Sequence, residues 1–116
     1  LCSMSKIDDY ARLHHMLDAS NKVIQFIKDE SRESLDEDEK LALALVRLIE
    51  IIGEAASKIS REKQTDLPQI PWREVIGMRN RIVHAYFDID LDIVWDTVTT
   101  NIPALAEELE SVLSQS

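Results

Sequence analysis

Apolar residues recur at steps of three and four along most of the chain, which is the spacing of one face of an α-helix. The first such run predicts an amphipathic helix from about residue 6 to residue 30. Its apolar face comprises Ile7, Tyr10, Leu13, His14, Leu17, Ile24 and Ile27. We expect this face to lie on the core of the fold.

A second helix is predicted to follow a charged stretch at residues 29–40 and to reach about Ser60. Ser34 with Glu37 three residues later resembles a capping box that would open this helix. Two apolar stripes run along it, and the one richer in small residues contains Gly53. Glycine inside a helix predicts close approach of another backbone. The wide apolar arc fits either a central helix of one bundle or a helix shared with a dimer interface.

The rest of the chain predicts a loop and two more helices. Residues 61–71 hold two of the three prolines and are expected to form a loop, after which a helix should run over residues 72–86. A last helix should begin at Asp90 and be kinked or split by Pro103. The prediction is therefore an all-α, up-and-down bundle of four to five helices. We expect a single domain over residues 1–116, with residues 1–5 and 114–116 frayed.

Composition narrows the functional classes. The single cysteine, Cys2, excludes an internal disulfide and a thiolate metal cluster. No apolar run approaches the roughly 18 residues of a membrane span, and no secretory signal is evident, so we expect a cytoplasmic protein. Residues 1–3 precede Met4 and are given no role. His14 and His15 are adjacent in a helix and point apart, so no metal site is expected.

Charge is segregated along the chain. Residues 58–81 carry six cations against three carboxylates, although the whole chain has a net charge of −9. After Arg81 there is no Lys or Arg, whereas seven carboxylates follow. This distribution fits either solvated helix faces or a small basic site that binds RNA locally.

Residues 79–86, Arg-Asn-Arg-Ile-Val-His-Ala-Tyr, concentrate the chemistry of the chain. At about 100° per residue, Asn80 and His84 would be nearly aligned on a helix, whereas Arg79 and His84 would be about 140° apart. One straight helix therefore does not aim Arg79 and His84 at a single point. Either Arg79 reaches round, or a second copy of the chain completes the site in a two-fold dimer.

The groups in this octet suit RNA cleavage without a metal. His84 can exchange a proton with the ribose 2′-hydroxyl or the leaving oxygen at neutral pH, and Arg79 can bind the phosphate through its planar fork. Asn80 and Arg81 would support RNA binding, with Asn80 orienting His84 or donating to the phosphate. Tyr86 would line the rim. The structural alternatives are a packed or surface histidine and an ion pair between Arg79 and Glu54 or Glu74.

Residues 71–95, PWREVIGMRNRIVHAYFDIDLDIVW, resemble the signature region of the HepT-like members of the HEPN ribonuclease family. The pattern RxxxxHxY is met by Arg79, His84 and Tyr86, and IIGEAASKIS in the second helix also fits this family. The resemblance spans nearly the whole chain. It implies a homodimeric, possibly higher oligomeric, helical bundle in which Arg79 and His84 of both protomers meet in an interfacial cleft.

The same resemblance implies an activity and a partner. Members of this family act as metal-independent ribonucleases in toxin–antitoxin pairs, without a cofactor. A minimal nucleotidyltransferase called MntA neutralises them by transferring AMP to the motif tyrosine, which here is Tyr86. We therefore expect a toxin ribonuclease of RNA. The alternative is a non-catalytic helical subunit that binds nucleotide or acts as an adaptor for the nucleotidyltransferase.

Overall fold

The computed structural model describes residues 2–84 and 88–115, with the backbone alone for residues 2–7. These residues form helices and one isolated β-bridge, which confirms the predicted all-α class. The elements in chain order are α1 (Cys2–Phe26), α2 (Arg32–Glu37), α3 (Glu39–Ser57), α4 (Arg61–Asp66), α5 (Trp72–Ile82), α6 (Leu91–Asp96), the π-helix η2 (Thr97–Asn101) and α7 (Ile102–Ser114).

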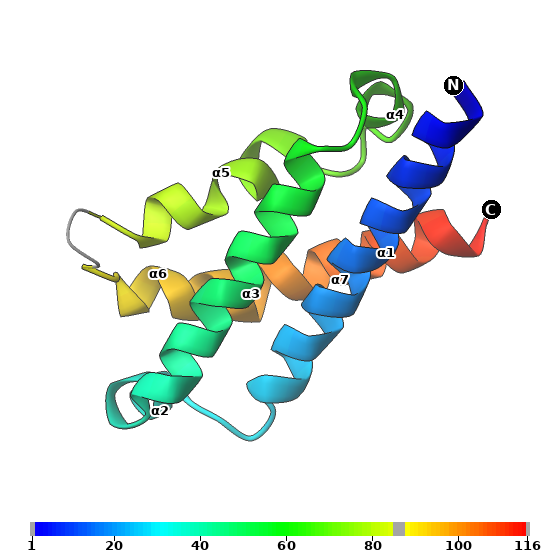
Figure 1. Cartoon of the computed structure of the whole chain (residues 1–116). Helices are drawn as coiled ribbons and strands as arrows, with labels where there is room; N and C mark the ends of the chain where they lie inside the picture. The colour runs from blue at the N-terminus through cyan, green and yellow to red at the C-terminus, as the bar shows by residue number, and fades with distance from the viewer. Residues whose placement is uncertain (1, 85–87, 116) are drawn as a thin grey trace.

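Helix α3 is the centre of the bundle. It packs against α1 on one side and against α5 on the other, and α1 packs in addition against α7 (Figure 1). The two short helices α2 and α4 lie at opposite ends of α3 (Figure 1). Both apolar stripes predicted on the second helix therefore find neighbours within the same chain.

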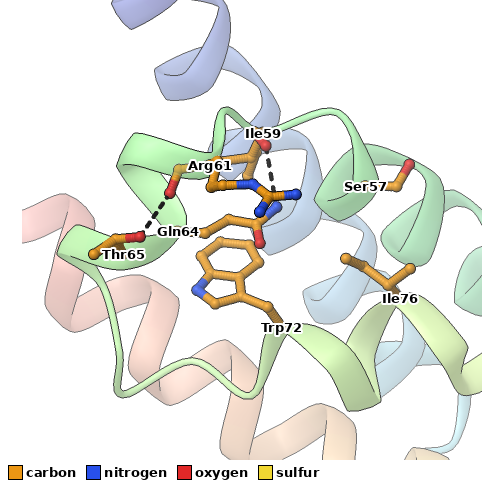
Figure 2. A pocket seen from close by; sticks show the side chains of 7 residues that line it. All are labelled: Ser57, Ile59, Arg61, Gln64, Thr65, Trp72 and Ile76. Atoms are coloured by element: carbon orange, nitrogen blue, oxygen red, sulfur yellow. Dashed lines mark hydrogen bonds between the residues drawn. The ribbon is translucent and has the colours of Figure 1, made fainter.

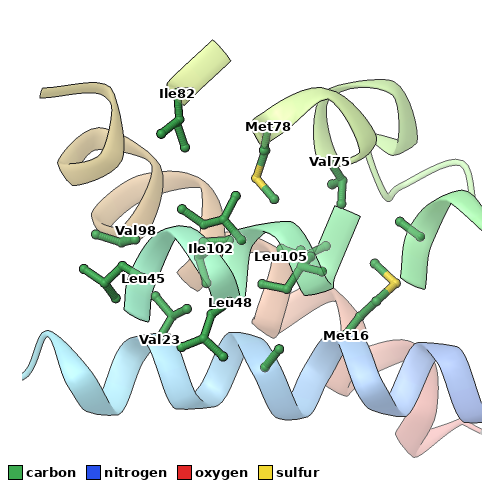
Figure 3. Close-up of a cluster of buried hydrophobic side chains, with 14 of the residues drawn as sticks. Met16, Val23, Leu45, Leu48, Val75, Met78, Ile82, Val98, Ile102 and Leu105 are labelled. Atoms are coloured by element: carbon green, nitrogen blue, oxygen red, sulfur yellow. The ribbon is translucent and has the colours of Figure 1, made fainter. Parts of the chain in front are cut away.

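One continuous core joins the long helices. Each contributes side chains to the buried cluster in Figure 3, where Met16 and Val23 of α1 lie below α3 and Met78 of α5 lies above it. Its largest fully buried members are Leu13, Met16, Val23, Leu35, Leu45, Ile49, Ile52, Ile70, Met78, Ile82, Ile102 and Leu109. Removing such side chains from water is the main force that holds amphipathic helices of this length together.

Gly53 lets α5 approach α3 closely. A Cβ atom at Gly53 would lie 3.2 Å from the carbonyl oxygen of Val75 and 3.4 Å from that of Ile76. Any larger side chain would therefore push the two helices apart. The predicted close approach is confirmed, and the neighbouring backbone belongs to α5 of the same chain.

The chain between α1 and α3 differs from the prediction. Helix α1 ends at Phe26, and α2 begins after Ser31, whose N–H donates to Oγ of Ser34 at 3.0 Å. Ser34 is therefore the third residue of α2, and the prediction that it opens the second helix is wrong. Asp38 interrupts the helix instead, because its backbone is extended and its carboxylate accepts the N–H of Leu41 at 3.1 Å.

Residues 61–66 form the short helix α4, where a loop was predicted. Ser60 caps this helix, since its Oγ accepts the N–H of Lys63 at 3.1 Å. The buried Asp9 of α1 accepts from both the N–H and the Oγ of Ser60, at 2.9 and 2.6 Å. A carboxylate 51 positions away in sequence thus fixes the start of α4.

Pro103 splits the last helix, as predicted. It lies in the first turn of α7, directly after the π-helix η2. Proline has no N–H to bond the carbonyl of Thr99, and the chain widens so that the N–H of Ile102 bonds the carbonyl of Thr97. Asp90 caps the N-terminus of α6, because its carboxylate accepts from the N–H groups of Asp92 and Ile93.

Across residues 2–84 and 88–115, the structure contains no helix both long enough and apolar enough to span a bilayer.

Candidate active site

Helix α5 carries the first part of the signature octet and ends earlier than predicted. Val75, Met78 and Ile82 are buried against α3 at helical spacing. After Ile82 the chain turns to an extended conformation, with φ −104° and ψ 118° at Val83. Val83 forms an antiparallel β-bridge with Ile89. The prediction that this helix continues through residue 84 is therefore wrong.

His84 lies at the base of the loop between α5 and α6. Its N–H donates to the carbonyl oxygen of Asp88 at 2.8 Å, and the N–H of Asp90 donates to the carbonyl of Ile82 at 2.9 Å. These bonds with the β-bridge fix the two sides of the loop, and the imidazole is exposed to solvent. The angle of about 140° expected on a continuous helix thus does not describe Arg79 and His84. Tyr86 lies outside the described residues.

Arg79 is held by an acidic residue of the neighbouring helix. Its Nε donates to Oε2 of Glu50 at 2.7 Å, while the other oxygen of Glu50 accepts from Nη1 of Arg47 at 2.6 Å. The two guanidiniums, Arg47 first and then Arg79, hold the pKa of Glu50 below its usual value. The ion pair that was the structural alternative to a catalytic Arg79 is therefore present, but its partner is Glu50 and neither Glu54 nor Glu74.

A groove of about 380 Å³ runs between α3 and α5 beside this ion pair. It is lined by Arg47, Glu50, Gly53, Glu54, Ser57, Ile76, Arg79 and Asn80. Close packing at Gly53 brings the two helices together here, and Glu50 and Arg79 lie about one turn away on either helix. Arg79 and Asn80 thus share one groove, which we call the Arg79 groove.

The other two predicted residues lie elsewhere. Arg81 lines a separate groove of about 420 Å³ between α5 and α7, beside Glu107 and Glu108. His84 does not line the Arg79 groove. Within one chain, the structure therefore brings together Arg79 and Asn80, and it places Arg81 and His84 on other parts of the surface.

The geometry gives the guanidinium of Arg79 a defined orientation. Its Nε is engaged by Glu50, yet the side chain remains 47% exposed, so the terminal nitrogens can meet a ligand. A planar fork fixed in this way suits a phosphate group. Among the side chains that the structure describes, no three of His, Cys, Asp or Glu are grouped so that they could hold a metal ion.

Sequence reasoning missed Glu50 and Arg47. Their signal is present, since Arg47, Glu50, Glu54 and Ser57 follow one another at steps of three and four along one side of α3. In the sequence alone, this row of polar residues is typical of a helix face that is exposed to solvent. Only the packing of α5 shows that this row faces the motif arginine.

Comparison with known proteins identifies the class. The model of the family described as "Ribonuclease HepT-like" matches residues 16–112. The match covers α5, His84 and most of the bundle. The chain belongs to the HepT-like ribonuclease family.

Several named proteins are similar over most of their length. "Putative RNase MJ1380" of Methanocaldococcus jannaschii is 37% identical over 94% of this chain and 100% of its own. "Putative RNase TTE0752" of Caldanaerobacter subterraneus subsp. tengcongensis is 34% identical over 89% of this chain and 92% of its own. "Probable ribonuclease HepT" of Thermococcus cleftensis is 38% identical over 78% and 86%. No solved structure matches the chain.

Proposed function

We propose that this protein is a metal-independent ribonuclease toxin whose site is completed by a second copy of the chain. The main support for a site shared by two chains is that Glu50 orients Arg79 in an open groove, whereas the exposed His84 lies outside that groove. Neither residue alone supplies both the phosphate clamp and the proton transfer that RNA cleavage needs. Two chains would bring two of each to one cleft.

The surface around the Arg79 groove supports such a dimer. Leu43, one turn before Arg47 on α3, is 50% exposed, and Ile76, in the groove, is 38% exposed. Large apolar side chains on the margin of a polar groove are typical of protein interfaces. A two-fold axis near this surface would cover both side chains and set the two His84 loops beside the two grooves.

In the proposed reaction, His84 of one copy takes the proton of a ribose 2′-hydroxyl. The resulting oxygen attacks the adjacent phosphorus, and the bond from phosphorus to the 5′-oxygen breaks. A water molecule protonates that leaving oxygen, and the proton held by His84 then returns to the solvent. Arg79 stabilises the negative charge on the phosphate oxygens, and the products are a 2′,3′-cyclic phosphate end and a 5′-hydroxyl end.

The proposed regulation uses Tyr86, which follows His84 by two positions in the sequence. An MntA-type nucleotidyltransferase would join AMP to the tyrosine oxygen. A bulky anionic group near His84 would exclude RNA both by its size and by charge repulsion. The proposal thus includes an antitoxin that acts by modification.

The test is cleavage of RNA by purified protein carrying His84→Ala. We expect at least a hundredfold loss of rate, because general acid–base catalysis contributes about 10²- to 10⁴-fold. The matched control is His15→Ala, which removes an exposed histidine of α1 and should leave the rate unchanged. Equal cleavage by wild type and His84→Ala would refute the assignment. Nucleotide binding with no cleavage by wild type would favour the adaptor role instead.

A further inference from the structure

A second pocket continues from the Arg79 groove toward α4. It has a volume of about 730 Å³ and is lined by Ser57, Ile59, Arg61, Gln64, Thr65, Trp72 and Ile76 (Figure 2). Ser57 and Ile76 line both this pocket and the Arg79 groove, so the two hollows share a wall. We call it the Trp72 pocket. The HepT-like motif does not include any residue of it.

Trp72 is fixed in place within this pocket. The indole extends from α5 toward α4 (Figure 2), and its Nε1–H donates to the carbonyl oxygen of Leu67 at 3.0 Å. The amide of Gln64 beside it is held by the carbonyl of Ile59 at 3.1 Å. The indole is only partly buried. A rigid aromatic ring at the wall of an open pocket is suited to stacking on a flat ligand, because little conformational freedom is lost on binding.

Arg61 is the charged residue among those that line the pocket. Arg61 is exposed at its rim and forms no ion pair with any side chain in the described part of the chain. Lys58 and Arg73, which flank the pocket in sequence, are likewise exposed. A local cluster of cations in a chain with a net charge of −9 favours an anionic ligand at this place.

The spacing along α5 relates this pocket to the Arg79 groove. Trp72, Ile76 and Arg79 follow at steps of four and three, so they share one side of the helix. Trp72 and Arg79 are seven residues apart, about 10 Å along the axis at 1.5 Å per residue. A stacked strand that rises roughly 3.4 Å per nucleotide covers this distance in about three nucleotides, and a more extended strand in fewer.

We propose that the Trp72 pocket binds a nucleotide of single-stranded RNA about two to three nucleotides from the cleaved phosphate, with the base stacked on Trp72 and a phosphate bound by Arg61. This rests on the proposed function, since it places the cleaved phosphate at Arg79. The aromatic ring and the cation are the two elements by which proteins hold single strands without reading their sequence. The pocket therefore makes the enzyme prefer single-stranded over paired RNA.

Binding is tested in the non-cleaving His84→Ala protein by the indole N–H signals in NMR spectra. The chain has two tryptophans, so Trp95 on α6 serves as an internal reference. Addition of a five-nucleotide single-stranded RNA should shift the Trp72 signal and leave that of Trp95 in place. Movement of neither signal at saturating RNA, or equal movement of both, would overturn the proposal. Trp72→Leu should weaken binding about tenfold, and Trp72→Phe should restore most of it.

Cleavage kinetics provide a second test that does not disturb the core. Arg61→Ala should raise KM for a five-nucleotide substrate several-fold with kcat unchanged, and it should leave a dinucleoside monophosphate unaffected, since that substrate does not reach the pocket. Lys22→Ala, on the exposed side of α1, is the control. Equal effects of Arg61→Ala on both substrates would refute the pocket while leaving the ribonuclease assignment intact. Conversely, a wild-type protein that binds RNA at Trp72 but cleaves no RNA would refute the proposed ribonuclease function and leave the proposed Trp72 pocket intact.

Discussion

Arg79 on α5 and Glu50 on α3 form an ion pair of 2.7 Å between Nε and Oε2, about one turn from the close contact of the two helices at Gly53. The contact gives the motif arginine a fixed direction. It also joins α5 to the central helix at the turn before the chain leaves helical conformation. The orientation of Arg79 therefore depends on the packing of α5 on α3 and on the ionisation of Glu50, which changes with pH.

We expect the contribution of Glu50 to stability to depend on pH. Its pKa is lower in the folded protein than the ordinary value of 4.5, so the ionised carboxylate stabilises the fold above that value. The contribution should disappear as pH falls through the depressed folded pKa. Because Glu50 is one third exposed, we expect about 1 kcal/mol or less. Denaturant unfolding of wild type and Glu50→Gln should differ at neutral pH and converge in acid.

Glu110→Gln is the control for this measurement. Glu110 is exposed on α7 and forms no ion pair with the described side chains. Its substitution should change stability little at any pH. A difference between wild type and Glu50→Gln that stays constant into acid would show that the ion pairs of Glu50 with Arg47 and Arg79 are not what stabilises the fold.

The two glycines should respond oppositely to alanine. Gly77→Ala, in α5, places a methyl group that meets no atom within 4 Å beyond its chain neighbours and the backbone of its own helix, and it should stabilise the protein by about 0.5–1 kcal/mol through helix propensity. Gly53→Ala gains the same propensity, but its methyl group would lie 3.2 Å from the carbonyl oxygen of Val75 in a packed core. We expect no gain or a net loss. Thermal unfolding of the two variants distinguishes them, and equal stabilisation would contradict the close packing of α5 on α3.

Removing Asp9 should destabilise the start of α4. Asp9→Ala leaves the N–H and Oγ of Ser60 without their buried acceptor, which costs about 1–3 kcal/mol. Asp8→Ala changes an exposed neighbour on the same helix and should have little effect. Denaturant unfolding gives both values. A loss shared equally by Asp8→Ala and Asp9→Ala would mean that charge on α1, and not this bond pair, is responsible.

The long helices could be predicted from sequence because each needs only a local pattern. Leu45 and Ile49 of α3, or Leu105 and Leu109 of α7, are spaced so that one side of the helix is apolar, and burial follows. Gly53 was informative for the same reason, since glycine in a helix interior lowers stability unless a neighbouring backbone needs the space. Pro103 likewise breaks helical bonding wherever it stands.

The details that define the site depend on contacts between distant residues. Helix α5 ends where Val83 pairs with Ile89 in a β-bridge, a contact that the helical spacing of the octet does not reveal. Glu50 reaches Arg79 from 29 positions away, although Glu54 and Glu74 looked equally suitable in sequence. The angle of about 140° between Arg79 and His84 assumed one continuous helix. Because Val83 is extended, that angle no longer supports a site shared by two chains. The proposal of a dimer now depends on the separate places of Arg79 and His84.

Modification by the partner should fall on Tyr86. Incubation with an MntA-type nucleotidyltransferase and ATP should transfer AMP to the tyrosine oxygen, release pyrophosphate and abolish RNA cleavage. The chain has one other tyrosine, Tyr10, which is 47% exposed. The centre of its ring lies 4.6 Å from the centre of the His14 ring. Peptide mass spectrometry separates the two sites, with Tyr86→Phe and Tyr10→Phe as matched variants. AMP on Tyr10, or inactivation of the Tyr86→Phe protein by the partner, would contradict the proposal.

A mixed dimer tests whether Arg79 and His84 act from different chains. Arg79→Ala and His84→Ala proteins should each be inactive alone as homodimers. After mixing and subunit exchange, half of the dimers in an equimolar mixture should carry one intact arginine and one intact histidine, on opposite chains. Recovery of cleavage then requires that the two residues cooperate across the interface.

Light scattering of the same samples checks that dimers form and exchange. As a control, Arg79→Ala mixed with an Arg79→Ala, His84→Ala double variant should stay inactive, because no dimer in that mixture contains an intact arginine. A mixed dimer that stays inactive although its formation is verified would show that Arg79 and His84 work within one chain.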